Sequence, residues 1–209
     1  MNLSSRWCVT AVVALGAVAC SDPVPPASQG AIWVQIQSNS PAPAGKSCPS
    51  GTSTTYDVPH VNPNPDPTSM KVEVLDDYNY LHWIVDGQAG STVSCSVKGG
   101  DTFTFSGRLK GQTVGSDGMS GVGAIDISNG TLDASHKGTA TISLSDTAAL
   151  SQSLTSPAAA CTVDAATGTG NHQVKAGSIW ASFTCTSVEA QPSDYCKAHG
   201  VFVLENCSQ

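Results

Sequence analysis

The chain has 209 residues, a net charge of −7 and only 12% charged side chains. Its 9 Lys and Arg residues are too few for the clustered basic surface that nucleic acids or anionic membranes attract, so we expect no nucleic-acid partner. The length suits one domain once a short leader is removed.

The first residues read as a targeting segment. Arg6 is the only charge before Asp22, and a mostly apolar run follows it from residue 7 to 19. The run is far shorter than the roughly 20 residues that span a bilayer. A charged start, a short apolar run and a small-residue exit predict a signal peptide over residues 1–19, and therefore an exported protein.

The exit of this segment leaves two interpretations open. Ala17-Val18-Ala19 fits the A-x-A pattern of ordinary signal cleavage. The same residues followed by Cys20 resemble the lipobox of bacterial lipoproteins. That resemblance implies that Cys20 becomes the palmitate-bearing first residue and anchors the chain in a membrane. By the family's sorting rule, Ser21 after it permits the outer membrane of the cell envelope.

Cysteine parity favours the lipoprotein interpretation. Cys8 leaves with the signal peptide, and if Cys20 is acylated an even number remains; otherwise one cysteine of an exported protein stays unpaired. Without any C-x-x-C pair, zinc ligation is not expected. Sequence leaves many connectivities open, and we predict that neighbours pair. The expected disulfides are Cys48–Cys95, Cys161–Cys185 and Cys196–Cys207.

The mature chain begins with a tether. Residues 20–30 are rich in proline, which favours an extended conformation and excludes helix. Beyond the tether, residues 38–69 are irregular and proline-rich, with a short edge strand expected at residues 53–58. Period-two alternation or turn-bounded apolar runs predict strands within residues 31–37, 71–87, 91–111, 121–135, 138–145, 178–188 and 201–207. Residues 193–200 resemble one or two helical turns, with Ser193 as cap and Gly200 as stop.

Short strands without a long amphipathic helix predict an all-β domain over residues 31–209. We expect an antiparallel β-sandwich or jelly roll that is stapled by disulfides and holds at most one or two short helices. The pair Thr184-Cys185 in a late strand resembles small β-rich envelope lipoproteins of bacteria whose role is uncharacterised. This match is too short to imply an activity.

One acidic pair is a candidate ion site. Asn129-Gly130 is the preferred dipeptide of a two-residue hairpin turn, which would place Asp126 directly opposite Asp133 on the outer face. Opposed like charges destabilise a sheet, so solvent, a lysine or a cation such as calcium should compensate. Two carboxylates fall well short of the roughly six to eight ligands of calcium. We therefore expect two solvated acids, no metal and no cofactor, with calcium as the weaker alternative.

Two tryptophans are candidate ligand contacts. Trp33 and Trp180 fall on the outer faces of their strands, where an indole can stack on a sugar ring; burial under a loop or second sheet is the alternative. No motif of a hydrolase, a zinc protease or a nucleotide-binding loop occurs. We expect a membrane-anchored envelope protein with a structural or binding role rather than an enzyme. Glycan binding and a secreted hydrolase remain alternatives, with a glycan or an envelope protein as partner.

Overall fold

The computed structural model describes residues 24–38, 44–48, 53–58, 72–75, 78–88, 90–114, 120–146, 153–166, 172–190 and 196–209. Within these ranges the secondary structure is all β, and no helix occurs. The predictions of an all-β, antiparallel fold and of disulfide staples are therefore confirmed. The predicted signal peptide and Cys20 lie outside the described residues.

The strands are labelled in chain order. Their bounds are β1 (Gln29–Ser38), β2 (Ser53–Val58), β3 (Val72–Leu75), β4 (Tyr78–His82), β5 (Ile84–Val85), β6 (Thr92–Gly99), β7 (Phe103–Val114), β8 (Ser120–Leu132), β9 (Lys137–Asp146), β10 (Leu154–Thr155), β11 (Cys161–Asp164), β12 (Gln173–Lys175), β13 (Ser178–Val188) and β14 (Cys196–Glu205). One antiparallel sheet runs in the order β2-β1-β14-β13-β11-β9-β8-β7-β6. Three short strands also pair with it: β5 with β1, β10 with β9 and β12 with β13. Strands β3 and β4 form a separate hairpin.

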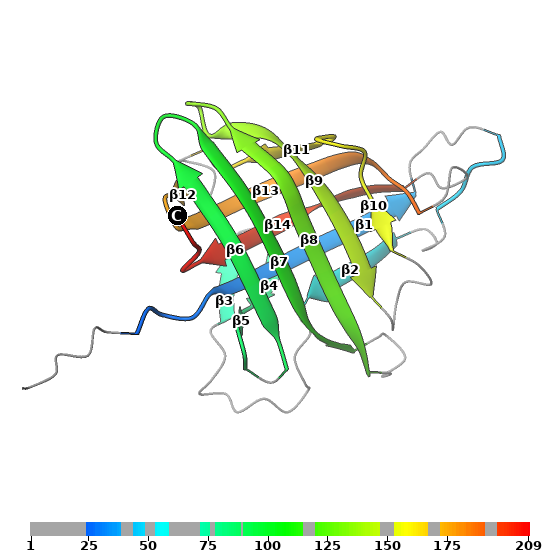
Figure 1. Cartoon of the computed structure of the whole chain (residues 1–209). Coiled ribbons are helices and arrows are strands. Elements are labelled where there is room, and N and C mark those ends of the chain that lie inside the picture. The colour runs from blue at the N-terminus through cyan, green and yellow to red at the C-terminus, as the bar shows by residue number, and fades with distance from the viewer. Residues whose placement is uncertain are drawn as a thin grey trace, which may run out of the picture.

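The long sheet curls on itself until its first and last parts face each other. In Figure 1, β6 to β9 pass in front of β1, β13 and β14. At one corner the curl closes: Ser208, just after β14, bridges to Ser96 of β6. The Val97 amide donates to the Ser208 carbonyl at 2.9 Å, and the Ser208 amide donates to the Cys95 carbonyl at 3.0 Å. We call this contact between Cys95–Val97 and Cys207–Ser208 the seam.

The core fills the space between the two facing layers. Alternate residues of the strands whose side chains are described point inward, which gives buried rows such as Ile32, Val34 and Ile36 in β1. Phe105 of the front layer stacks on Phe202 of the back layer with ring centroids 5.8 Å apart. Burying an aromatic side chain of this size stabilises a fold by about 2–3 kcal/mol, so these contacts hold the curl closed.

The predicted hairpin turn at Asn129-Gly130 is wrong. Strand β8 continues through both residues, and a register shift between Ser128 and Thr131 marks a β-bulge. Asn129 has a φ of 51°, which asparagine tolerates better than most residues. A Cβ atom at Gly130 would lie 2.6 Å from the Phe105 ring, so glycine is required there for close packing. The bulge lets the chain bury Phe105 and still continue the strand.

The predicted helical turns near Gly200 are wrong where the structure describes them. Residues from Cys196 to Gly200 belong to β14, which pairs with β1 on one side and β13 on the other. Cys196 and Ala198 point into the core and are fully or almost fully buried. Two partner strands satisfy the backbone on both sides, and this tertiary pairing outweighs the local helix signals.

Of the three predicted disulfides, one is confirmed and two are wrong. Cys161–Cys185 forms as expected. The other bonds are Cys48–Cys196 and Cys95–Cys207. Cys196 opens the 10-residue strand β14 and Cys207 follows its end, so about 30 Å of extended chain separates them. Bonded cysteines need Cα atoms within about 7 Å, so these sequence neighbours could never pair.

Candidate functional site

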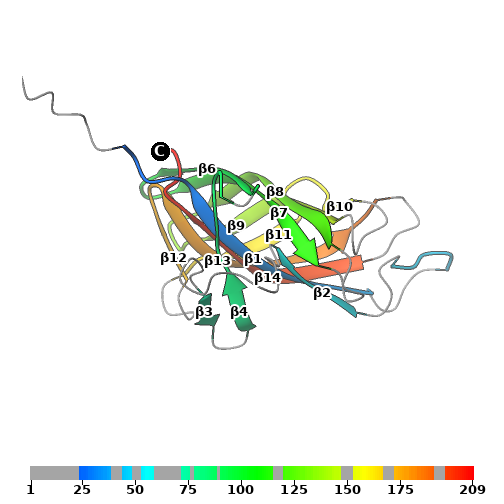
Figure 2. The same ribbon diagram turned by 90° about the horizontal axis from the view of Figure 1, so that it is seen from below.

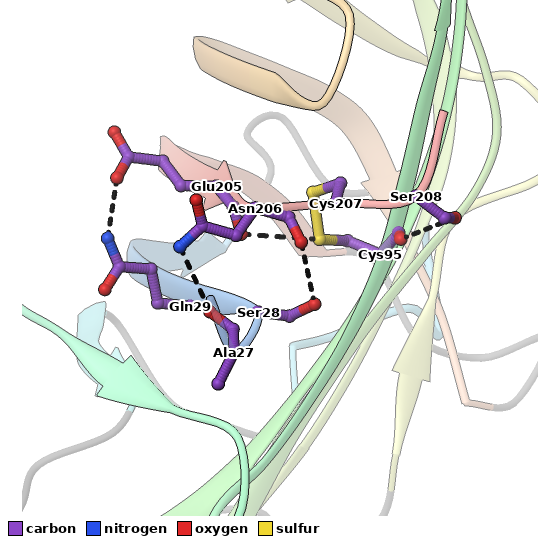
Figure 3. Close-up of a disulfide and its surroundings, with 8 residues drawn as sticks. All are labelled: Ala27, Ser28, Gln29, Cys95, Glu205, Asn206, Cys207 and Ser208. Carbon is purple, nitrogen blue, oxygen red and sulfur yellow. Dashed lines mark hydrogen bonds between the residues drawn. A yellow bond between two sulfur atoms is a disulfide. The ribbon is translucent and has the colours of Figure 1, made fainter. Parts of the chain in front are cut away.

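The chain enters and leaves the domain at the same end. Figure 3 shows Ala27, Ser28 and Gln29 beside Glu205 and Asn206, next to the Cys95–Cys207 disulfide. The Asn206 amide donates to the Ala27 carbonyl at 3.0 Å, and the Ser28 hydroxyl donates to the Asn206 carbonyl at 3.0 Å. The Gln29 amide donates to the Glu205 carboxylate at 2.7 Å. We call these five residues the clasp.

The clasp lies where the proline-rich segment that precedes residue 27 meets the domain. Pro25 and Pro26 line an open, polar hollow of about 440 Å³ together with Lys175 and Gln209. Val24, the first described residue, is 90% exposed. Strand β1 begins at Gln29, so the extended segment gives way to the sheet at the clasp.

The structure separates the two predicted acidic residues. Asp126 lies opposite Arg108 of β7 and Ser143 of β9. Its carboxylate forms an ion pair with Arg108 at 3.4 Å. Asp133 lies beyond the end of β8, in the turn of residues 133–136 that joins β8 to β9. The predicted cross-strand Asp126–Asp133 pair is therefore wrong, because the bulge moved the turn.

Asp133 has a structural role in that turn. Its carboxylate accepts hydrogen bonds from the Ser135 hydroxyl at 2.5 Å, the Ser135 amide at 2.8 Å and the Lys137 amide at 3.2 Å. These bonds, of which the one from the Ser135 hydroxyl has the largest effect, lower the pKa of Asp133.

Within the described ranges, no cluster of three or more His, Cys, Asp or Glu residues could hold a metal ion.

The predicted tryptophans do lie on the outer face, but they do not form a shared platform. Trp180 is only 4% exposed and packs against Trp83, with ring centroids 5.8 Å apart. In Figure 2 the β3–β4 hairpin lies beneath this face of β1, β13 and β14. The prediction of ligand stacking on Trp180 is therefore wrong. Trp33 packs beside the same apolar cluster but keeps part of its surface in solvent.

The outer face of β1, β14 and β13 changes from apolar to polar along the strands. At the clasp end Ala31, Val203 and Trp180 form one cross-strand row. Four residues further along β1, the cross-strand row consists of Gln35, His199 and Thr184. Beyond this row, Gln37 lies opposite Lys197. An open groove of about 470 Å³ lies over this polar part. Its lining includes Gln37, Ser182, Thr184, Thr186, Lys197 and His199.

Two basic side chains set the electrostatics of this groove. Burial, and then the neighbouring Lys197 ammonium, lower the pKa of His199, so the imidazole is neutral at pH 7. Its ring meets Trp33 edge to face, with centroids 5.8 Å apart. Lys197 is partly buried and forms no ion pair with any described residue. The groove therefore offers hydroxyl, amide and imidazole groups together with one positive charge.

Sequence reasoning missed this groove because it assigned His199 and Lys197 to a helix. The available signal was the alternation of Cys196, Ala198 and Gly200 with these polar residues, which continues into the apolar end of β14.

In the described part of the chain no helix is long and apolar enough to cross a membrane. Comparison with protein-family models, curated proteins and solved structures finds nothing that matches this chain.

Proposed function

We propose that this protein is an exported lipoprotein, anchored to the cell envelope through Cys20, whose domain has a structural or binding role without catalysis. One observation carries the proposal. All six cysteines from Cys48 to Cys207 bond with one another. The domain therefore leaves no partner for Cys20, and Cys8 lies inside the predicted signal peptide. Acylation gives Cys20 a chemical role that pairing does not.

The clasp supports the same proposal. Only the segment from Cys20 to Pro26 separates the predicted acyl group from the first clasp residue, Ala27. At about 3.3–3.6 Å per residue, this segment reaches at most some 25 Å. A lipid on Cys20 would hold the domain close to the bilayer with the clasp end toward it. The hydrogen bonds at Ala27, Ser28 and Gln29 would then transmit part of any pull on the anchor to the end of strand β14.

The non-catalytic part rests on the groove. Asp and Glu are absent from the described residues that line it, so none of these residues is an acidic partner that could orient His199 as a base. Its ring instead packs against Trp33.

Intact mass spectrometry of the native chain tests the anchor. We expect a mature chain that begins at Cys20 and carries acyl mass, and that gains six hydrogen atoms when its three disulfides are reduced. Cys20→Ser should abolish the acyl mass and move the protein from the detergent phase to the aqueous phase. Ser21→Ala is the matched control and should remain acylated. A native chain that begins at an unmodified Cys20 would overturn the proposal.

A further inference from the structure

We infer that the groove over β13 and β14 binds an acidic glycan, a polysaccharide whose sugar rings carry carboxylates. Lys197 would contact the carboxylate, and Thr184, Ser182 and Gln37 would contact ring hydroxyls. This inference gives a ligand class to the binding role proposed above. It depends on that proposal only for the compartment in which the glycan is met, because none of the residues that line the groove lies in the predicted tether.

The charge of the groove selects for an anion. Lys197 lines the groove with its side chain partly buried and forms no ion pair within the described residues. Among the residues that the structure describes, the lining includes no Asp or Glu. In the neighbouring strand, Asp164 lies opposite Ser182, but the Lys137 ammonium already pairs with it at 2.9 Å. A carboxylate from a ligand would thus be the partner of Lys197, in a charge-assisted bond about twice as strong as a neutral one.

The remaining groups suit a sugar. The hydroxyls of Ser182 and Thr184 each donate and accept hydrogen bonds, as does the amide of Gln37. The neutral ring of His199 has one donor and one acceptor nitrogen, and Trp33 beside it adds partly exposed apolar surface. Sugar hydroxyls both donate and accept, while their ring C–H groups pack on apolar surface. A fully ionised phosphate could use only the donor atoms of these groups, whereas sugar hydroxyls could use their donor and acceptor atoms.

A β-bulge shapes the groove at its charged part. Cys185 pairs with Ala198 and Val188 pairs with Cys196, so β13 holds one extra residue opposite Lys197. A bulge bends its strand and is over-represented next to functional sites. Thr186, in the bulged segment, is exposed and lines the groove. The bulge and the unpaired lysine are independent observations that meet at one place.

Binding of defined oligosaccharides to the full chain in detergent tests the inference. The probes are hexagalacturonate, which is acidic, and cellohexaose, which is neutral, followed by calorimetry and by tryptophan fluorescence. We expect hexagalacturonate to bind and cellohexaose to bind at least tenfold more weakly. Lys197→Gln should weaken hexagalacturonate about tenfold, the loss expected when a charged hydrogen bond is removed. Lys197→Arg should retain most of the affinity and shows that the site can be substituted without unfolding.

Matched controls separate the groove from the rest of the molecule. Lys110→Gln removes an exposed lysine from β7, outside the groove, and should leave binding unchanged. Cys20→Ser should also leave it unchanged, so that a failed anchor and a failed groove give different results. Equal affinity for both probes, full affinity in Lys197→Gln, or no binding of hexagalacturonate at about 1 mM would overturn the inference.

Discussion

Removal of the Cys95–Cys207 disulfide, by Cys95→Ala with Cys207→Ala, should open the seam and destabilise the whole domain. The bond joins residues 112 apart in sequence. A loop of that length corresponds to about 5 kcal/mol of stabilisation in the chain-entropy estimate. Cys48–Cys196 still links the same two parts of the chain, so this figure is an upper value. Even so, the loss is a large share of the roughly 5–15 kcal/mol that stabilises a typical domain.

Loss of the Cys95–Cys207 disulfide should also loosen the seam locally. Without the disulfide, the seam retains the hydrogen bonds that Ser208 makes with Val97 and Cys95, all at the end of the chain. We expect the amides of Val97 and Ser208 to exchange with solvent much faster. The amides that join β13 to β14 should stay protected, because Phe183 and Phe202 still pack between the layers.

Equilibrium unfolding in guanidinium chloride, followed by tryptophan fluorescence, measures the global loss, and hydrogen exchange measures the local opening. Cys161→Ala with Cys185→Ala is the control, since that bond spans 24 residues and corresponds to about 3.5 kcal/mol. The control lacks a seam contact and should leave the exchange of Val97 unchanged. A stability within about 1 kcal/mol of the native chain, or a peptide map that links Cys48 to Cys95, would contradict this prediction.

Three further predictions concern the fold and its pH dependence. Gly200→Ala should lower the free energy of unfolding in denaturant by about 2 kcal/mol or more, because the new Cβ atom would lie 2.0 Å from a backbone carbonyl oxygen of β1. Gly100→Ala is the control and should have little effect, because the space around Gly100 is open. Asn129→Ala should cost about 1 kcal/mol at its positive φ, and Asn129→Gly should not; equal stabilities would contradict the bulge. Burial lowers the pKa of His199 and His172 below the usual 6.5, so the unfolded chain takes up protons first on acidification. Stability should therefore be full above about pH 6.5 and fall below it, and His199→Gln with His172→Gln should flatten the change in melting temperature between pH 7.5 and pH 5.

Alternation along the sequence is enough to predict which side of most strands faces the core. Alternation in β1 and β13 placed Ile32, Ile179 and Phe183 inside and Trp33 and Trp180 outside, as the structure has them. This works because successive side chains of a strand point to opposite faces wherever the strand is paired. The even number of cysteines after Cys20 likewise predicted that all would bond, since parity does not depend on geometry.

Which distant residues come into contact depends on how the sheet folds. The curl of the sheet brings Cys207 to Cys95 of β6 and Cys196 to Cys48. The sequence around each of these cysteines does not indicate its partner. The Phe105 ring packs against Gly130, and Asn129-Gly130 forms a β-bulge instead of the predicted hairpin turn. As a result, Asp126 and Asp133 do not pair across strands. An outer face is not always an exposed face: Trp83, far away in sequence, covers Trp180. Such contacts depend on long-range packing, which local periodicity cannot encode.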